Sequence, residues 1–229
     1  MNFLYSILNL VYPPRCAVCA ELIEMGIDGH LCCVCREKYA NNKGITVKYM
    51  GDTGVKNTTN LTRGYAIFEY KDVKNSIDHF KFKGFKNDGI ALGKIMYEVA
   101  KNNFPYILEE ADMLVPVPVH KKRFKERGFN QSEVLAKRLA ELSGKMCCYN
   151  GIKRVRYTAP QSGLHPDQRL KNIKNAFETN SEIDFNGKKI VLIDDIFTTG
   201  ATINECAGIL RGSGAAQVDF LTLSAALLK

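Results

Sequence analysis

Apolar runs and amphipathic stretches alternate along most of this chain. Short runs of consecutive apolar residues predict buried strands, and apolar residues at helical spacing, such as Val73, Ile77 and Phe80, predict helices with one buried side. The predicted strands cover residues 65–70, 113–119, about 147–155, 190–193 and 217–227. The predicted helices begin near Asp72, Asp88 and Gln131, and a last helix ends near Arg211, where glycines follow.

The order strand, loop, helix, strand is typical of the α/β class. It predicts a mostly parallel sheet flanked by helices, with ligands bound at the carboxyl ends of the strands. Basic loops at 81–88 and 120–130 and a polar stretch at 157–172 are expected to connect the elements. The chain is expected to divide into a module at 1–40, a connecting segment at 41–63 with at most one short strand, and a main domain at 64–229.

The composition is that of an ordinary globular protein. Of 229 residues, 45% are hydrophobic and 24% are charged, which excludes a mainly disordered chain, a collagen-like repeat and a coiled coil. No stretch reaches the roughly 18 consecutive apolar residues that a membrane span needs. The formal net charge of +8 and the pI of about 9.0 indicate an anionic partner, such as phosphate groups, nucleic acid or an acidic surface.

Residues 1–12 are apolar but lack the basic start and the cleavage site of a signal peptide. We expect them to form a short helix packed on its own domain, and we expect a cytoplasmic protein. In a reducing compartment the eight cysteines are expected to be metal ligands or buried thiols rather than disulfides.

Two cysteine pairs near the N-terminus predict a metal site. Cys16-x2-Cys19 is followed after twelve residues by Cys32-x2-Cys35. Each pair can supply two corners of a tetrahedron, and Zn2+ prefers four thiolates in that geometry. We therefore expect a structural zinc in a small ribbon, with no open position for catalysis. Four unrelated buried cysteines are the alternative.

The other cysteines show no such pattern. Cys33 has no partner three residues on, and His30 is an alternative ligand that the four-cysteine interpretation does not need. Cys147, Cys148 and Cys206 fall on predicted strands and a helix, where buried inert thiols are expected.

An acidic pair follows one of the predicted strands. Asp194 and Asp195 come directly after the apolar residues 190–193, where a ligand would be met. The next residues offer hydroxyls, N–H groups and a helix start that suit a phosphate monoester. They are Thr198, Thr199, Gly200, Ala201 and Thr202. Because carboxylates suit the hydroxyls of a ribose and not a phosphate, the segment favours a sugar phosphate over a nucleoside triphosphate. A chance strand-to-turn sequence is the alternative.

This segment resembles the phosphoribosyl pyrophosphate (PRPP) motif of the type I phosphoribosyltransferases: four apolar residues, two acids, then Thr-Thr-Gly-x-Thr. The resemblance implies that Asp194 and Asp195 bind the ribose hydroxyls and that residues 198–202 bind the 5-phosphate.

Positive charge is concentrated in the middle of the chain, where residues 121–174 include 14 basic and four acidic residues. A solvated surface is the simpler explanation for any one lysine. Arginine, however, offers paired donors to phosphate oxygens. The basic residues that follow the strand at 113–119 are expected to hold a pyrophosphate. They are His120, Lys121, Arg123 and Arg127.

Nearly the whole chain is similar to the ComF family, bacterial proteins linked to DNA uptake during natural transformation. Five segments carry the resemblance in order: the doubled CxxC, KFKG, VPVPVHKKRFKERGFNQSEVLA, RVRYTAPQSGL with the R, N and AF that follow, and VLIDDIFTTGAT. The resemblance implies an N-terminal zinc finger joined to a type I phosphoribosyltransferase-like domain.

The residues and the resemblance agree on PRPP as the ligand. If the protein is an enzyme, it would displace pyrophosphate from carbon 1 of the ribose through an oxocarbenium-like transition state. Mg2+ would bridge the pyrophosphate and hydroxyl oxygens. Asp195 at the ribose and Arg156 closing over the pyrophosphate are the expected catalytic residues, and the acceptor is not predicted.

Two other functions remain open. The basic face would also suit single-stranded DNA, with aromatic side chains available for stacking on bases. They are Phe82, Phe85, Phe124 and Phe129. The third interpretation is a non-catalytic scaffold that docks another competence protein, such as a DNA helicase.

Overall fold

The computed structural model of this chain describes residues 13, 15–19, 21–23, 31–40, 43–47, 60–81, 86–158 and 166–226. The helix expected at 1–12 lies outside these ranges. Within them, no helix combines the length and the apolar character needed to cross a membrane.

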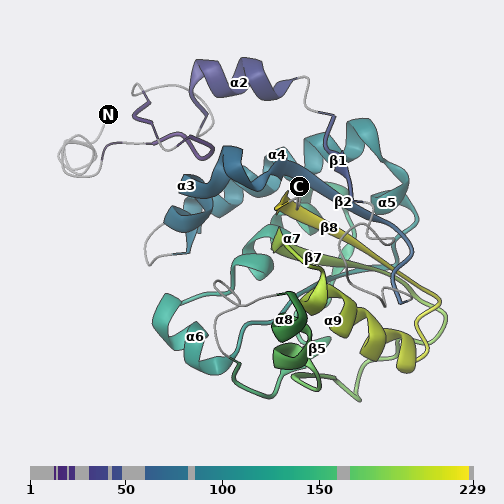
Figure 1. Ribbon diagram of the computed structural model, residues 1–229. Helices are drawn as coiled ribbons and strands as arrows, with labels where there is room; N and C mark the ends of the chain where they lie inside the picture. Colours follow the sequence, from purple (N-terminus) through teal and green to yellow (C-terminus); the bar gives the residue numbers. More distant parts are fainter. Residues whose placement is uncertain are drawn as a thin grey trace, which may run out of the picture.

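A six-stranded sheet forms the centre of the molecule (Figure 1). The strands lie in the order β1-β2-β8-β7-β3-β4, and every neighbouring pair is parallel except β1 with β2. Their bounds are β1 Ile45–Thr46, β2 Gly64–Glu69, β3 Met113–Pro116, β4 Met146–Cys147, β7 Lys189–Phe197 and β8 Gln217–Ala225. The predicted mostly parallel sheet is confirmed.

Helices cover both faces of this sheet (Figure 1). On one face α3 (Tyr70–Phe80), α4 (Lys86–Asn103) and α7 (Gln131–Ser143) pack in one apolar cluster with Val191 and Ile193 of β7. On the other face α9 (Ala201–Gly212) packs with Ile190 and Leu192. Strand β7 serves both clusters because successive side chains of a strand point to opposite faces. The shorter helices are α2 Cys33–Ala40, α5 Tyr106–Glu109, α6 Lys121–Arg127 and α8 Pro166–Ile173.

The basic segment at 120–130 was expected to be a loop, and this is wrong because most of it forms α6. The side chain of His120 caps the helix start by accepting a hydrogen bond from the N–H of Lys122 (3.2 Å). Gly128 ends the helix in the left-handed conformation, with φ of 85°. Lysine, arginine and glutamate favour helix, but a stretch with so few apolar residues gives no apolar periodicity to read.

The expected strand at 147–155 is two strands that belong to different sheets. Strand β4 extends the main sheet, whereas β5 (Ile152–Arg154) pairs antiparallel with β6 (Phe177–Thr179) in a two-stranded sheet. The turn residues Asn150 and Gly151 separate them. The polar stretch at 157–172, for which no element was expected, contains most of α8.

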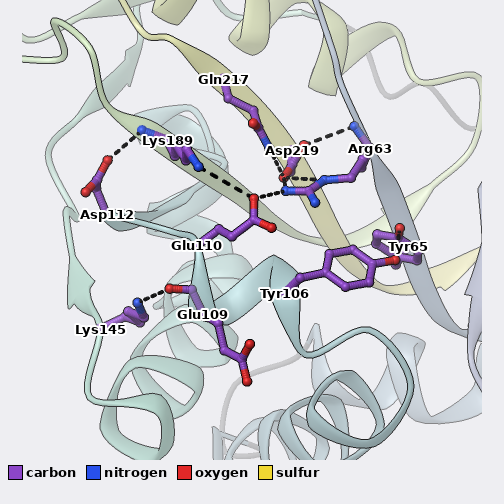
Figure 2. A network of polar contacts seen from close by, with 10 residues as sticks. All are labelled: Arg63, Tyr65, Tyr106, Glu109, Glu110, Asp112, Lys145, Lys189, Gln217 and Asp219. Carbon is purple, nitrogen blue, oxygen red and sulfur yellow. Dashed lines mark hydrogen bonds and ion pairs between the residues drawn. The ribbon is translucent and has the colours of Figure 1, made fainter.

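Ion pairs join the strands at the edge of the sheet where the parallel strands begin (Figure 2). Arg63, just before β2, binds Asp219 in β8 at 2.7 Å and Glu110, just after α5, at 3.1 Å. Glu110 also lies 3.7 Å from Lys189, the first residue of β7. The N–H of Lys189 donates to Asp112 (2.8 Å). These contacts hold β2, β7 and β8 together at the edge opposite to the acidic pair.

We expect Asp219→Ala to lower the free energy of unfolding by about 3 kcal/mol, because Arg63 loses a buried partner and keeps its charge. Glu110→Ala, which removes the solvent-exposed partner, should have a much smaller effect. Urea unfolding curves of the two variants test this, provided that the slope of each curve matches that of the parent. An equal decrease in the free energy of unfolding in both variants would contradict the assignment of Asp219 as the main partner of Arg63.

Candidate functional site

A cavity of about 600 Å³ lies at the edge of the sheet where the parallel strands end. Residues after β3, the end of β7 and Ala226 after β8 line it, together with residues of α6, α7, α8 and β5. Among the described residues, the basic side chains that line it are Lys81, Arg123, Arg127, Arg154 and Arg169. The acidic ones are Glu126, Asp194 and Asp195. The cavity therefore offers cations for an anionic ligand around a local pair of carboxylates.

The acidic pair lies within β7 rather than after it, because the strand continues to Phe197. Asp194 Oδ1 accepts hydrogen bonds from Ser132 Oγ (2.8 Å) and from the N–H of Asp195 (2.9 Å). Burial, and next the charge of Asp195, raise the pKa of Asp194 well above its usual range, while the bond from Ser132 opposes this shift. Two acceptors of hydrogen bonds thus face the cavity at a fixed place on the central strand.

The loop at 198–200 and the first turn of α9 surround a smaller hollow of about 30 Å³. Gly200 has φ of 74°, and a Cβ at this position would lie 2.9 Å from the ring of Phe197, so the turn requires glycine. No side chain caps the start of α9. Helix starts of this kind bind anions at many phosphate sites.

Helix α6 has two different sides. The side chains on its inner side line the cavity; they are Arg123, Glu126 and Arg127. Lys121 and Lys125, about half a helical turn from Arg123, are exposed, and Phe124 is exposed as well. One short helix therefore offers cations both to the cavity and to the solvent.

Two of the arginines that line the cavity are held by neighbouring groups. Arg127 Nη1 donates to Gln131 Oε1 (3.1 Å). Arg154 in β5 donates to the hydroxyl of Thr158, and its guanidinium lies 5.3 Å from the ring centroid of Phe177. Burial lowers the pKa of both arginines, although an arginine remains charged at any physiological pH. An anionic ligand would restore the charge balance around them.

The structure brings most of the predicted ligand residues together. Those that line the large cavity are Asp194, Asp195, Thr198, Thr202, Arg123 and Arg127. Those that line the small hollow include Gly200 and Ala201. Three others line neither: His120 caps α6, Lys121 is on the outer side of α6, and Thr199 is only 1% exposed.

Arg156, which was expected to close over the site, points elsewhere. Its Nη2 donates to the backbone carbonyls of Asn172 (2.9 Å) and Lys174 (2.5 Å) at the end of α8. Arg156 does not line the cavity, whereas Arg169 of α8 does. In this arrangement Arg156 holds the helix that carries Arg169.

Several residues that line the cavity were not named as ligands from the sequence, among them Gln131, Ser132, Arg154 and Arg169. Gln131 and Ser132 follow Asn130, the residue that begins α7 and accepts a hydrogen bond from the N–H of Ser132 (3.1 Å). An asparagine at a helix start next to a strand end was the available signal. Arg154 and Arg169 lie in segments that the sequence resemblance includes, but their direction depends on the folded chain.

Among the aromatic residues considered for stacking, Phe124 is 44% exposed. Phe129 packs on Phe80, with 5.6 Å between ring centroids. Phe82 and Phe85 lie outside the described residues. Phe124 is thus the one of these four, among the described residues, that presents a large exposed surface.

The four predicted metal ligands come together at the N-terminal end of the described chain. The Sγ atoms of Cys16, Cys19, Cys32 and Cys35 all lie within 4.8 Å of one another. Burial, and next the neighbouring thiols, raise the pKa of Cys35, so a cation is needed to hold all of them as thiolates. Cys33 is exposed and outside the cluster. The cluster can bind a metal such as zinc.

Comparison with known proteins finds one matching domain model and two relatives that match over most of the chain. The family model described as "Phosphoribosyl transferase domain" matches residues 124–227. Competence protein F of Haemophilus influenzae is 28% identical over 225 residues, which cover 93% of this chain and 97% of that protein. Competence protein ComFC of Bacillus subtilis is 28% identical over 210 residues, 91% of this chain and 82% of that protein. These two matches support the resemblance of nearly the whole chain to the ComF family.

Other relatives of this chain match over shorter regions. DNA utilization protein YhgH of Salmonella typhimurium is 41% identical over 112 residues, which are 49% of this chain and 48% of that protein. Among solved structures, the chain is similar to the glutamine PRPP amidotransferase of B. subtilis complexed with ADP and GMP (21% identity, TM-score 0.41, 61% of this chain and 26% of that chain). It is also similar to the hypoxanthine phosphoribosyltransferase of Trypanosoma cruzi (12% identity, TM-score 0.38, 60% of this chain and 63% of that chain).

We expect the purified protein to contain about one zinc ion, because four thiolates in a tetrahedral arrangement bind it tightly. Cys19→Ser should abolish this metal, whereas Cys33→Ser, a neighbouring thiol outside the cluster, should leave it unchanged. Elemental analysis after gel filtration measures the metal content. Less than about half an ion per parent chain, or an equal loss in both variants, would contradict the assignment.

Proposed function

We propose that this chain binds PRPP in the cavity at the carboxyl ends of the strands. One observation carries the proposal: a pair of carboxylates, an uncapped helix start and a set of arginines line two hollows that share Asp194, Thr198 and Thr202. PRPP has the groups that these side chains would bind, namely hydroxyls, a monophosphate and a pyrophosphate.

Each part of PRPP has a proposed partner. Asp194 and Asp195 accept hydrogen bonds from the ribose hydroxyls, and residues 198–202 bind the 5-phosphate through N–H and hydroxyl groups. Arg123 and Arg127 bind the pyrophosphate, since they line the same cavity. Arg154 and Arg169 join this set, whereas His120 and Arg156 act by holding α6 and α8. Mg2+, carried with the pyrophosphate oxygens, would neutralise part of the ligand charge.

The reaction that this site would support is the transfer of phosphoribose. A nucleophile on the acceptor would form a bond to carbon 1 of the ribose as the bond from that carbon to the pyrophosphate oxygen breaks, and pyrophosphate leaves with the electron pair. Arginines beside the leaving group would stabilise its developing charge. The acceptor would supply the nucleophile. The proton that the nucleophile loses would pass to solvent or to the departing pyrophosphate.

The biological setting proposed for this chain comes from the names of its relatives, competence protein F and DNA utilization protein YhgH. We propose that the chain serves the same processes, namely DNA uptake and the use of the DNA taken up. A phosphoribosyltransferase-like domain in that setting would act on a product of DNA breakdown or respond to the supply of PRPP.

We expect calorimetric titration to detect binding of PRPP in the presence of Mg2+. Asp194→Asn combined with Asp195→Asn should weaken it about 100-fold or more, because two charged acceptors are lost. The free energy of unfolding should not fall, since the substitution removes repulsion between adjacent carboxylates. Asp184→Asn, at an exposed turn, is the matched control. PRPP affinity that is unchanged in the double variant would refute the site.

A second function, binding of single-stranded DNA, is favoured by the outer side of α6. Lys121, Phe124 and Lys125 are exposed there, and none of them lines the cavity. Lysines that track a backbone beside an aromatic ring that stacks on bases are typical of single-strand binding. This function is compatible with PRPP binding, because none of these three side chains lines the cavity.

We expect Lys121→Ala with Lys125→Ala to weaken binding of a single-stranded oligonucleotide and to leave PRPP binding unchanged. The slope of log affinity against log salt should become shallower by about 1.4, the value for two lost phosphate contacts. Arg123→Ala with Arg127→Ala is the matched pair and should mainly affect PRPP. Fluorescence anisotropy at several salt concentrations gives both slopes. Equal affinity for single and double strands, with no effect of Phe124→Ala, would leave only general adhesion of a basic protein.

A further inference from the structure

The first turn of α7 lies beside the acidic pair and is fixed there by its capping residue. Asn130 accepts a hydrogen bond from the N–H of Ser132 (3.1 Å) and donates one to the carbonyl of Val117, just after β3 (3.0 Å). Ser132 is only 3% exposed. Its side chain has therefore little freedom, and its hydroxyl points to Asp194 on β7, 2.8 Å away.

The bond from Ser132 gives the two carboxylates different surroundings. Asp194 Oδ1 accepts two hydrogen bonds from the protein, one from Ser132 Oγ and one from the N–H of Asp195. Asp194 and Asp195 both line the cavity, where a ligand would meet them. We propose that Ser132 is a positioning residue, which holds the side chain of Asp194 in one orientation for the ribose hydroxyls; this inference rests on the proposed binding of PRPP.

An uncharged donor suits this place because the charged groups around Asp194 have other roles. Asp195 repels it from the same strand, and Arg127 of α6 and Arg154 of β5 attract it from the cavity wall. The thiol of Cys206 in α9 also faces it, and burial raises the pKa of that thiol, so it stays neutral. If the arginines bind the pyrophosphate, a hydroxyl is the donor that remains with Asp194 whether or not the ligand is present.

Removing this donor has a consequence that a purely structural role would not have. The hydrogen bond favours the carboxylate, so its loss raises the pKa of Asp194 further. The charged form then dominates only at higher pH. Binding that needs the carboxylate must therefore move to higher pH when the hydroxyl is removed, whereas a general loss of structure would weaken binding equally at every pH.

The test measures the affinity for PRPP with Mg2+ by calorimetry between pH 6.5 and pH 8.5. We expect Ser132→Ala to weaken the binding of PRPP about tenfold at neutral pH. The pH at which the affinity rises should be higher in this variant than in the parent. Ser132→Thr, which keeps the hydroxyl, should restore the parent curve, and Ser132→Cys, a weaker donor, should lie between them. Titration of the PRPP phosphates is the same in every curve and cancels in the comparison.

Ser143→Ala is the matched control, because it removes the same group from the other end of α7, where Ser143 Oγ binds the carbonyl of Leu139 (2.7 Å). The affinity of this variant for PRPP should depend on pH in the same way as that of the parent. Circular dichroism identifies any variant that does not fold. A Ser132→Ala curve that coincides with the parent, or a loss that is equal at every pH and that threonine does not restore, would overturn the proposal.

Carbon-13 NMR titration of the Asp194 carboxyl, in the protein without ligand, separates this inference from the proposed function. The signal is assigned by its absence in Asp194→Asn. If the parent does not bind PRPP but Ser132→Ala raises the pKa of Asp194, the proposed function fails and the positioning of Asp194 by Ser132 stands. If the parent binds PRPP and the pKa of Asp194 is the same in both proteins, the site stands and the role of Ser132 is refuted.

Discussion

Two adjacent carboxylates at the end of a central strand repel each other, and much of the surrounding structure offsets this repulsion. Asp194 and Asp195 belong to β7, which lies between β8 and β3 and cannot shift without breaking both ladders. Burial makes the pair still less favourable, as the raised pKa of Asp194 indicates. The fold therefore needs donors and cations close to this point, and they come from elements on either side of β7 in the sequence.

These groups are supplied by the ends of short elements rather than by the sheet. The start of α7 provides a hydroxyl, α6 and β5 provide guanidinium groups, and the start of α9, which no side chain caps, lines the neighbouring hollow. At the other end of the same strand, Lys189 belongs to the ion-pair network of Arg63 and Asp219 (Figure 2). Polar contacts at one end of β7 thus hold the strands in place, while those at the other end face a cavity.

The sequence alone predicted the parts of the fold and site that depend on local pattern. The strand that leads to the acidic pair and the glycine turn after it are contiguous, and the cysteine spacing follows from tetrahedral geometry. Helix α6 was missed because its stability comes from its caps, and not from an apolar side. Ser132 lies 62 residues before Asp194, and Arg156 binds carbonyls 16 and 18 residues later. Contacts of this kind depend on the tertiary arrangement, which residue spacing does not encode.

Helix α6 has only seven residues, and His120 and Gly128 cap its two ends. The backbone positions of its inner arginines and its outer lysines are therefore set together. A molecule that draws the helix toward the cavity also repositions the outer side, and a polymer bound outside changes where the arginines stand. Thermodynamic reciprocity then requires each occupant to alter the affinity for the other by the same factor. Binding of a small sugar phosphate on one side of α6 would in this way change the affinity for single-stranded DNA on the other part of the same helix, and the reverse.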